Sequence, residues 1–119
     1  MKGKEWIDYY LAGVQSEGTL RPEDLFNMYN HIGTFLIVAM KDGSLDMNKT
    51  FVSEFTNMQK RLIDGFNKDR DFDNLEVSAS LYDMDSLINE ILCKYNYELT
   101  TLEGDGACFI IAEMQEDDC

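Results

Sequence analysis

The chain has 119 residues, of which 45% are hydrophobic and 28% charged, and its 23 acidic and 10 basic side chains give a net charge of −13. This composition excludes a largely disordered chain and indicates one globular domain, residues 1–119. The longest apolar run, residues 35–40, is too short to span a bilayer, and the N-terminus lacks the apolar segment of a secretory signal. Three widely spaced cysteines argue against a disulfide framework, so we expect a reducing, cytoplasmic environment.

Two helices are predicted in the first part of the chain. Residues 4–15 carry apolar side chains at helical spacing. A second helix is expected over 22–41, with Pro22 at its first position and Gly43 beyond its end. Its apolar residues cover most of the circumference, which indicates a buried, central helix. Within it, residues 34–40 fit a buried strand as well as a helix.

A third helix is predicted over residues 48–67. Its apolar side chains recur every three or four residues, so they form one stripe along the helix. The stripe consists of Phe51, Phe55, Met58, Leu62 and Phe66.

The second part of the chain changes pattern. Residues 76–82 alternate between apolar and polar, which predicts a strand, and Asp83 is a suitable cap for a helix over 84–95. Residues 97–103 and 107–114 flank a Gly-Asp-Gly segment and predict a β-hairpin. The expected fold class is therefore α+β, with three N-terminal helices followed by a β-α-β-β unit that holds a small, mainly antiparallel sheet.

The charge is distributed very unevenly. Residues 1–70 hold 10 acids and 9 bases, whereas residues 71–119 hold 13 acids and one base. We therefore divide the domain into a near-neutral helical half (1–68), an acidic β-α-β-β half (69–115) and a tail expected to fray (116–119). We expect the carboxylates of the acidic half to share one outward-facing surface, which would repel nucleic acid and anionic membranes and attract basic proteins.

These features predict a non-enzymatic interaction protein without a cofactor. Its partner would be a basic protein, such as a nuclease or another nucleic-acid-binding protein, and it would bind neither nucleic acid nor membrane directly. Phage-encoded inhibitors of bacterial defence (the anti-CRISPR class), nuclease-immunity proteins and DNA mimics use this strategy, and the oligomeric state stays open. The candidate contact residues are acids at expected loops or helix starts, with two tyrosines as anchors: Asp69, Asp71, Asp73, Asp83, Asp85, Glu103, Asp105, Tyr82 and Tyr97.

A calcium-binding loop is one alternative. Asp69, Asp71 and Asp73 occupy alternate positions, as in the first half of an EF-hand loop. Asn74 stands where that loop has its glycine, and Ser80 stands where it has the bidentate glutamate. The alternative is thus a weak cation site, and the competing interpretation is an exposed acidic loop.

A carrier protein is the second alternative. The segment "LYDMDSLINEIL" resembles the attachment segment of acyl and peptidyl carrier proteins, in which an Asp-Ser-Leu triplet opens a helix. The resemblance implies that Asp85, Ser86 and Leu87 form the triplet and that Ser86 carries a phosphopantetheine arm. The competing interpretation is that Asp83, Asp85 and Ser86 simply cap a helix.

Overall fold

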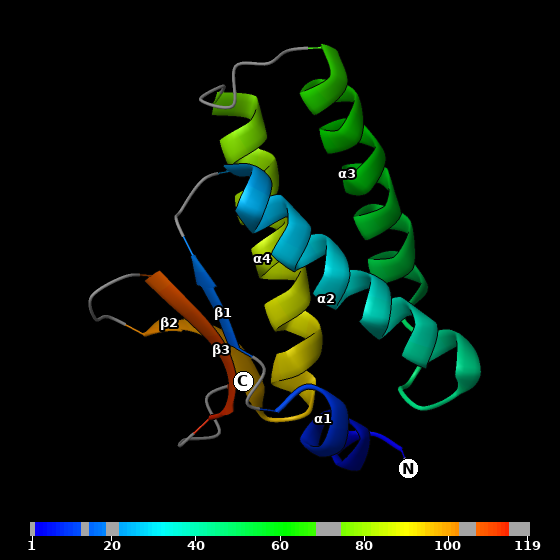
Figure 1. The fold of residues 1–119 in the computed structure, drawn as a ribbon. Coiled ribbons are helices and arrows are strands. Elements are labelled where there is room, and N and C mark those ends of the chain that lie inside the picture. Colours follow the sequence, from blue (N-terminus) through cyan, green and yellow to red (C-terminus); the bar gives the residue numbers. More distant parts are fainter. Residues whose placement is uncertain (1, 13–14, 19–21, 69–74, 103–106, 115–119) are drawn as a thin grey trace.

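The computed structural model describes the backbone of residues 2–12, 15–18, 22–68, 75–102 and 107–114, and the side chains of residues 2–12, 24–65, 79–100 and 110–114. The described chain forms four helices and three strands (Figure 1). In chain order these are α1 (Lys4–Tyr10), β1 (Gln15–Gly18), α2 (Pro22–Asp42), α3 (Lys49–Lys68), α4 (Leu75–Lys94), β2 (Tyr97–Leu102) and β3 (Ala107–Glu113). The predicted α+β class is confirmed.

The three long helices pack together, and the small sheet lies to one side of them (Figure 1). In Figure 1, α2 crosses in front of α4, α3 lies on the side away from the sheet, and α1 sits below the end of α4. Residues 34–40, for which the sequence left helix and strand open, are helical and lie within α2. A single cluster of buried apolar side chains joins the helices to β2 and β3.

The predicted strand over residues 76–82 is wrong, because this segment forms the first turns of α4. In a strand, Ala79 and Leu81 would share a face, but Ala79 is exposed whereas Leu81 is buried. Ser80, next to Leu81, is also buried. Three alternating apolar residues were too short a pattern to distinguish a strand from the start of a long helix.

The sheet is antiparallel, with strand order β1-β3-β2. The β2–β3 hairpin is confirmed, with Tyr97 opposite Glu113 and Thr100 opposite Ile110. The third strand does not come from the acidic half, because β1 pairs with β3 from residues 15–18, where we expected the first helix to end. The predicted β-α-β-β order is therefore corrected: the second part of the chain forms the helix α4 and the β2–β3 hairpin, and β1 from the first part adds the third strand of the sheet.

The short helix α1 is held in place by contacts with residues that are distant in the sequence. Its N-cap residue Gly3 donates its backbone N–H to the carbonyl of Ser44 at 2.7 Å. The Lys4 Nζ lies 2.6 Å from the Glu113 Oε1. Because a helix of 7 residues is unstable alone, these contacts and the buried Trp6 and Ile7 are what stabilise α1.

The helices α2 and α3 approach each other closely at Gly33. A Cβ built on Gly33 would lie 2.0 Å from the Cζ of Phe55, whose side chain is fully buried. The absence of a side chain at Gly33 is therefore required for the crossing of the two helices.

Two findings bear on the expected environment. Cys93 is disulfide-bonded, which removes the cysteine argument for a reducing compartment, an argument that rested on a chain without a disulfide framework. Across the described ranges, none of the helices combines the length and the apolar composition that a bilayer crossing requires.

Candidate functional site

An open groove of about 470 Å³ lies between α3 and α4. Four residues from each helix line it, and three of the eight are acidic. The lining residues are Glu54, Asn57, Met58, Arg61, Asp83, Ser86, Leu87 and Glu90.

Helical spacing explains why these residues meet in one groove. On each helix the four lining residues follow the pattern i, i+3, i+4 and i+7, which places them on one side of the helix. The two helices run in opposite directions (Figure 1), and the start of α3 lies beside the end of α4, where Lys94 Nζ is 3.7 Å from the Asp46 Oδ2. Glu54 therefore lies across the groove from Glu90, and Arg61 lies across from Asp83.

The carboxylates of the groove form no ion pairs with the described residues. Glu54, Asp83 and Glu90 are all exposed. In the part of the chain that the structure describes, none of them forms an ion pair or a hydrogen bond, and neither does Arg61. The groove thus carries three carboxylates and one guanidinium. Its acidic end, formed by Glu54 and Glu90, has no ion pair within the described ranges.

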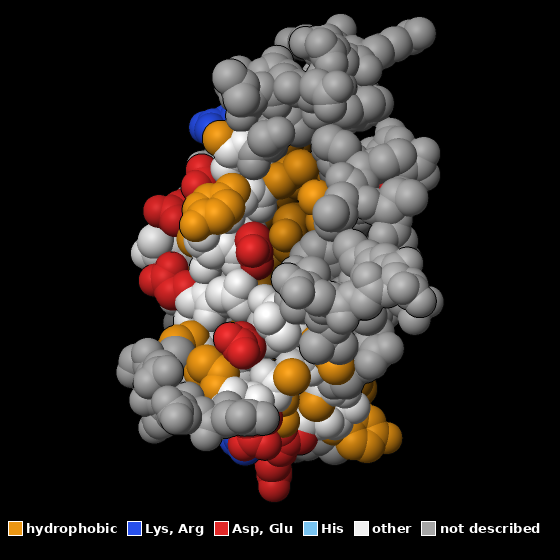
Figure 2. Space-filling view, turned by 90° about the vertical axis from the view of Figure 1, so that its left-hand side faces the viewer, with side chains coloured by type: hydrophobic (Ala, Val, Ile, Leu, Met, Phe, Trp, Pro, Cys, Tyr) orange, Lys and Arg blue, Asp and Glu red, His pale blue; other side chains and the backbone are white. Residues whose placement is uncertain are grey.

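Tyr82 stands beside the groove with its side chain 72% exposed. It precedes Ser86 by four residues on α4, so the two side chains lie on neighbouring turns of one helix side. Tyrosine is enriched among the residues that anchor protein interfaces. Figure 2 shows acidic side chains along one edge of a face of the molecule, with exposed hydrophobic side chains between them and few basic ones.

Asp85 does not belong to this surface, contrary to the prediction. Residues that are two positions apart on a helix point in directions about 200° apart, so Asp85 points away from Asp83 and from the groove. It is partly buried, it accepts a hydrogen bond of 2.8 Å from the Asn89 Nδ2, and burial raises the pKa of its carboxyl. Its charge is also the second cause, after burial, that raises the pKa of Tyr29 to about 12.

Tyr97 is not an exposed anchor either. Its side chain is 4% exposed, because the alternation of β2 turns Tyr97 and Leu99 into the core and Glu98 outward. Its hydroxyl donates a hydrogen bond to the Asp8 Oδ1, and burial, followed by this hydrogen bond, raises the pKa of Tyr97 to about 12. Tyr97 therefore holds α1 against the sheet.

The expected single acidic surface is wrong for the described carboxylates of the second half. Asp83 and Glu90 face the groove, while Glu98 is exposed on the sheet and Glu113 pairs with Lys4. The predicted contact residues Asp69, Asp71, Asp73, Glu103 and Asp105 lie outside the described residues.

Sequence reasoning missed Glu54, because it belongs to the near-neutral half. The signal that could have found it is the repeated spacing of charge on two consecutive helices. Glu54 and Arg61 are separated by the same seven positions as Asp83 and Glu90.

The structure bears on the carrier alternative and leaves the calcium alternative untested. The Asp85-Ser86-Leu87 triplet lies inside α4, which begins at Leu75, so it does not open a helix as the carrier resemblance required. The proposed calcium ligands Asp69–Asp73 lie outside the described residues. Within the residues that the structure does place, no group of three or more His, Cys, Asp or Glu side chains could hold a metal ion.

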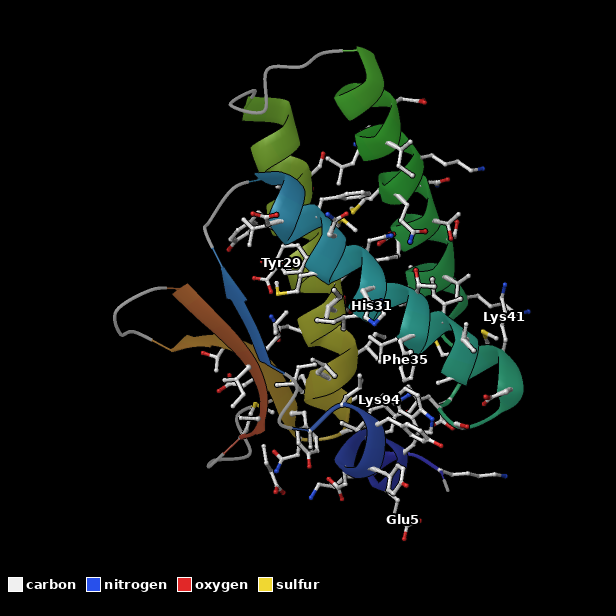
Figure 3. All side chains as sticks on the ribbon, viewed as in Figure 1. Glu5, Tyr29, His31, Phe35, Lys41 and Lys94 are labelled. Carbon is white, nitrogen blue, oxygen red and sulfur yellow. The ribbon has the colours of Figure 1, made fainter. Side chains whose placement is uncertain are left out.

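A second exposed surface, formed by α1 and α2, was also not predicted. We call it the aromatic surface, and it consists of Tyr9, Tyr10, His31, Phe35 and Val38. Figure 3 shows His31 and Phe35 following one another along α2, and their ring centroids are 6.4 Å apart. The Phe35 ring also contacts the buried Trp6 at 5.3 Å, so part of this surface continues into the core.

Comparison of the chain with protein-family models, with curated proteins and with solved structures finds no match. The features from which a function is inferred are therefore the groove, its unpaired carboxylates and the exposed Tyr82 beside it.

Proposed function

We propose that this protein is a non-enzymatic binding protein that docks its α3–α4 groove on a basic surface of a partner protein. The observation that carries this proposal is that Glu54, Asp83 and Glu90 are exposed along one groove and form no ion pair with the described chain, in which Arg61 is the basic residue that also lines the groove. Carboxylates arranged in this way attract a cationic partner and orient it before contact.

Charge alone gives a fast encounter rather than a tight complex, so a binding surface also needs side chains that exclude water. Tyr82 can supply such a contact at the edge of the groove, and Met58 and Leu87 supply apolar surface within it. The combination of acids, an exposed tyrosine and apolar side chains supports binding to a protein surface rather than solubility alone.

The partner class follows from the chemistry that this surface complements. Proteins that bind nucleic acid carry lysines and arginines where phosphates lie, and an acidic protein can occupy that site in place of the nucleic acid. We therefore infer that the partner is a nuclease or another nucleic-acid-binding protein, and that binding inhibits it. The net charge of −13 opposes direct binding of the chain to nucleic acid.

The test is affinity capture from a nuclease-treated extract with the full chain immobilised. We expect basic nucleic-acid-binding proteins to be retained at about 50 mM salt and released at about 500 mM, because ionic screening weakens exposed charge pairs. The double variant Asp83→Asn/Glu90→Gln should lose them.

The matched control is Glu5→Gln/Glu98→Gln, which removes the same charge from two exposed acids that do not line the groove. It should retain the same proteins as the native chain. Retention that does not depend on salt, or that falls equally in both double variants, would contradict the proposal.

A further inference from the structure

The acidic end of the groove places two like charges opposite each other. Glu54 comes from α3 and Glu90 comes from α4, and the antiparallel arrangement brings them to the same end of the groove. Two unpaired carboxylates on facing helices repel each other, and a cation placed between them removes that repulsion.

The protein does not provide this cation from the side chains that the structure describes. Arg61 is seven residues from Glu54 on α3, which is about 10 Å along the helix axis. Lys94 follows Glu90 by one turn, but its Nζ pairs with the Asp46 Oδ2 at 3.7 Å. Among the described side chains, none therefore places a cation between Glu54 and Glu90, and this position is open to a cation supplied by a ligand.

The middle of the groove indicates what kind of cation fits. Met58 and Leu87 are partly buried, pack against the core and leave apolar surface open to the groove. A metal ion with its water shell would leave this surface uncovered, whereas a long side chain with an aliphatic stem and a charged end would cover it. Asn57 and Ser86 add hydrogen-bonding groups along the same path.

Of the two long cationic side chains, arginine suits the site better. A guanidinium is planar and has five N–H donors, so it can hydrogen-bond carboxylates on two sides at once, and it loses its hydration more readily than an ammonium. Arg61 at the other end of the groove disfavours a second cation there. Resting on the proposed function, we propose that the groove binds one arginine side chain of the basic partner, with its guanidinium between Glu54 and Glu90 and its stem on Met58 and Leu87.

The direct test is a titration of the full chain, labelled with ¹⁵N, followed by amide chemical shifts. The probes are N-acetyl-arginine amide, N-acetyl-lysine amide and N-acetyl-citrulline amide, the last being a neutral analogue of arginine. We expect arginine to shift the amides near Glu54, Leu87 and Glu90 most and to bind at least about threefold more tightly than lysine, because of its planar donors. Citrulline should produce no localised shift.

Matched variants separate the groove from the general acidic field. Glu54→Gln and Glu90→Gln should each weaken arginine binding at least about fivefold, since each removes one of the two charged acceptors. Glu98→Gln removes the same charge from the exposed side of β2 and should leave the affinity unchanged. Thermal unfolding of each variant checks that the fold persists, and both groove variants should unfold no lower than the native chain.

Two results would overturn the inference. Shifts spread over the whole surface would show that arginine responds only to the acidic field, and an equal loss in Glu98→Gln and Glu54→Gln would show the same. Failure of the proposed function is recognised separately with a hexa-arginine peptide. If that peptide binds the native chain and Glu54→Gln/Glu90→Gln equally well at low salt, the arginine position between Glu54 and Glu90 is wrong, whereas absence of any binding contradicts the proposed function as well.

Discussion

The α3–α4 groove and the aromatic surface are both exposed, but they differ in how many of their side chains contact other side chains of the described chain. On the aromatic surface, ring contacts run from Tyr9 to Tyr10 at 4.9 Å and from Tyr10 to Phe35 at 6.1 Å. In the groove, by contrast, the carboxylates have no partner in the described chain. Exposure alone therefore does not distinguish the two surfaces, and the absence of ion pairs among the described residues of the groove is the reason why we propose the groove as the binding surface.

The same comparison separates stability from binding. The rings of the aromatic surface continue into the core through Trp6, so removing one of them should cost folding free energy. The groove carboxylates are exposed and unpaired, so their removal should change binding and leave folding nearly untouched. The four predictions below test this separation, from the largest expected effect to the smallest.

Gly33→Ala should have the largest effect, because both surfaces depend on the crossing of α2 and α3. The new Cβ would lie 2.0 Å from the Phe55 ring, which is fully buried and has no room to move. We expect a loss of about 3 kcal/mol in the free energy of unfolding, measured by chemical denaturation. The double variant Gly33→Ala/Phe55→Leu should recover part of the loss, since leucine lacks the clashing ring atoms. Native-like stability of Gly33→Ala would show that the two helices are not in close contact.

Phe35→Ala and Tyr82→Ala compare the two surfaces directly. Phe35 is 38% exposed and contacts Trp6, Tyr10 and His31, so its loss should cost about 1–2 kcal/mol of stability. Tyr82 is 72% exposed, so its loss should change stability by less than about 0.5 kcal/mol. In the capture assay the order should reverse, with Tyr82→Ala losing more of the retained protein. Equal effects of the two variants in both assays would abolish the distinction.

Tyr97→Phe tests how α1, and with it part of the aromatic surface, is held against the sheet. It removes the hydrogen bond from the Tyr97 hydroxyl to Asp8 and keeps the buried ring. The expected loss is about 1 kcal/mol, typical of one hydrogen bond. Amide hydrogen exchange should speed up in α1 and stay unchanged in α3. Uniform acceleration over both helices would mean that α1 is not an independently held element.

Asp85→Asn should have the smallest effect, and it should be stabilising. Burial raises the pKa of Asp85 in the folded state, so the folded protein favours the protonated carboxyl. The native chain should therefore gain stability as the pH falls through this raised pKa, whereas the asparagine variant lacks that gain. At pH 7 we expect the variant to be more stable by no more than about 0.5 kcal/mol, because the site is only half buried.

The difference between Asp85→Asn and the native chain should disappear below the ordinary pKa of aspartate. Thermal unfolding from pH 3 to pH 8 measures it, with Asp83→Asn as an exposed control on the same helix. A variant that is less stable than the native chain at pH 7 would mean that the hydrogen bond from Asn89 requires the charge.

Much of the fold was predictable because local patterns were long. The apolar stripe of α3 and the two strands around Gly-Asp-Gly were recognised from the sequence, and both are present. The first turns of α4 were not recognised, because residues 76–82 alternate over too short a stretch. The strand β1 was missed because four residues carry little signal, and β3 alone gives them a pairing partner.

The candidate site was predictable only in part. Asp83 and Tyr82 were identified, but Asp85 and Tyr97 turned out to be turned toward the core. The reason is that a sequence shows which residues are charged or aromatic, and the side of an element on which they lie depends on where that element begins. Because α4 begins nine residues earlier than predicted, Asp85 lies in the middle of a long helix that packs against other elements and not at an exposed helix start.

The sequence by itself determined the α+β class, the positions of α2 and α3 and the excess of acid in the second half. These follow from composition and periodicity, which are properties of neighbouring residues. Only the tertiary structure decided that Glu54 joins Asp83 and Glu90 in one groove and that Glu113 is neutralised by Lys4. Whether a charge is paired depends on residues that are far apart in the chain and come together only when the helices and the sheet pack.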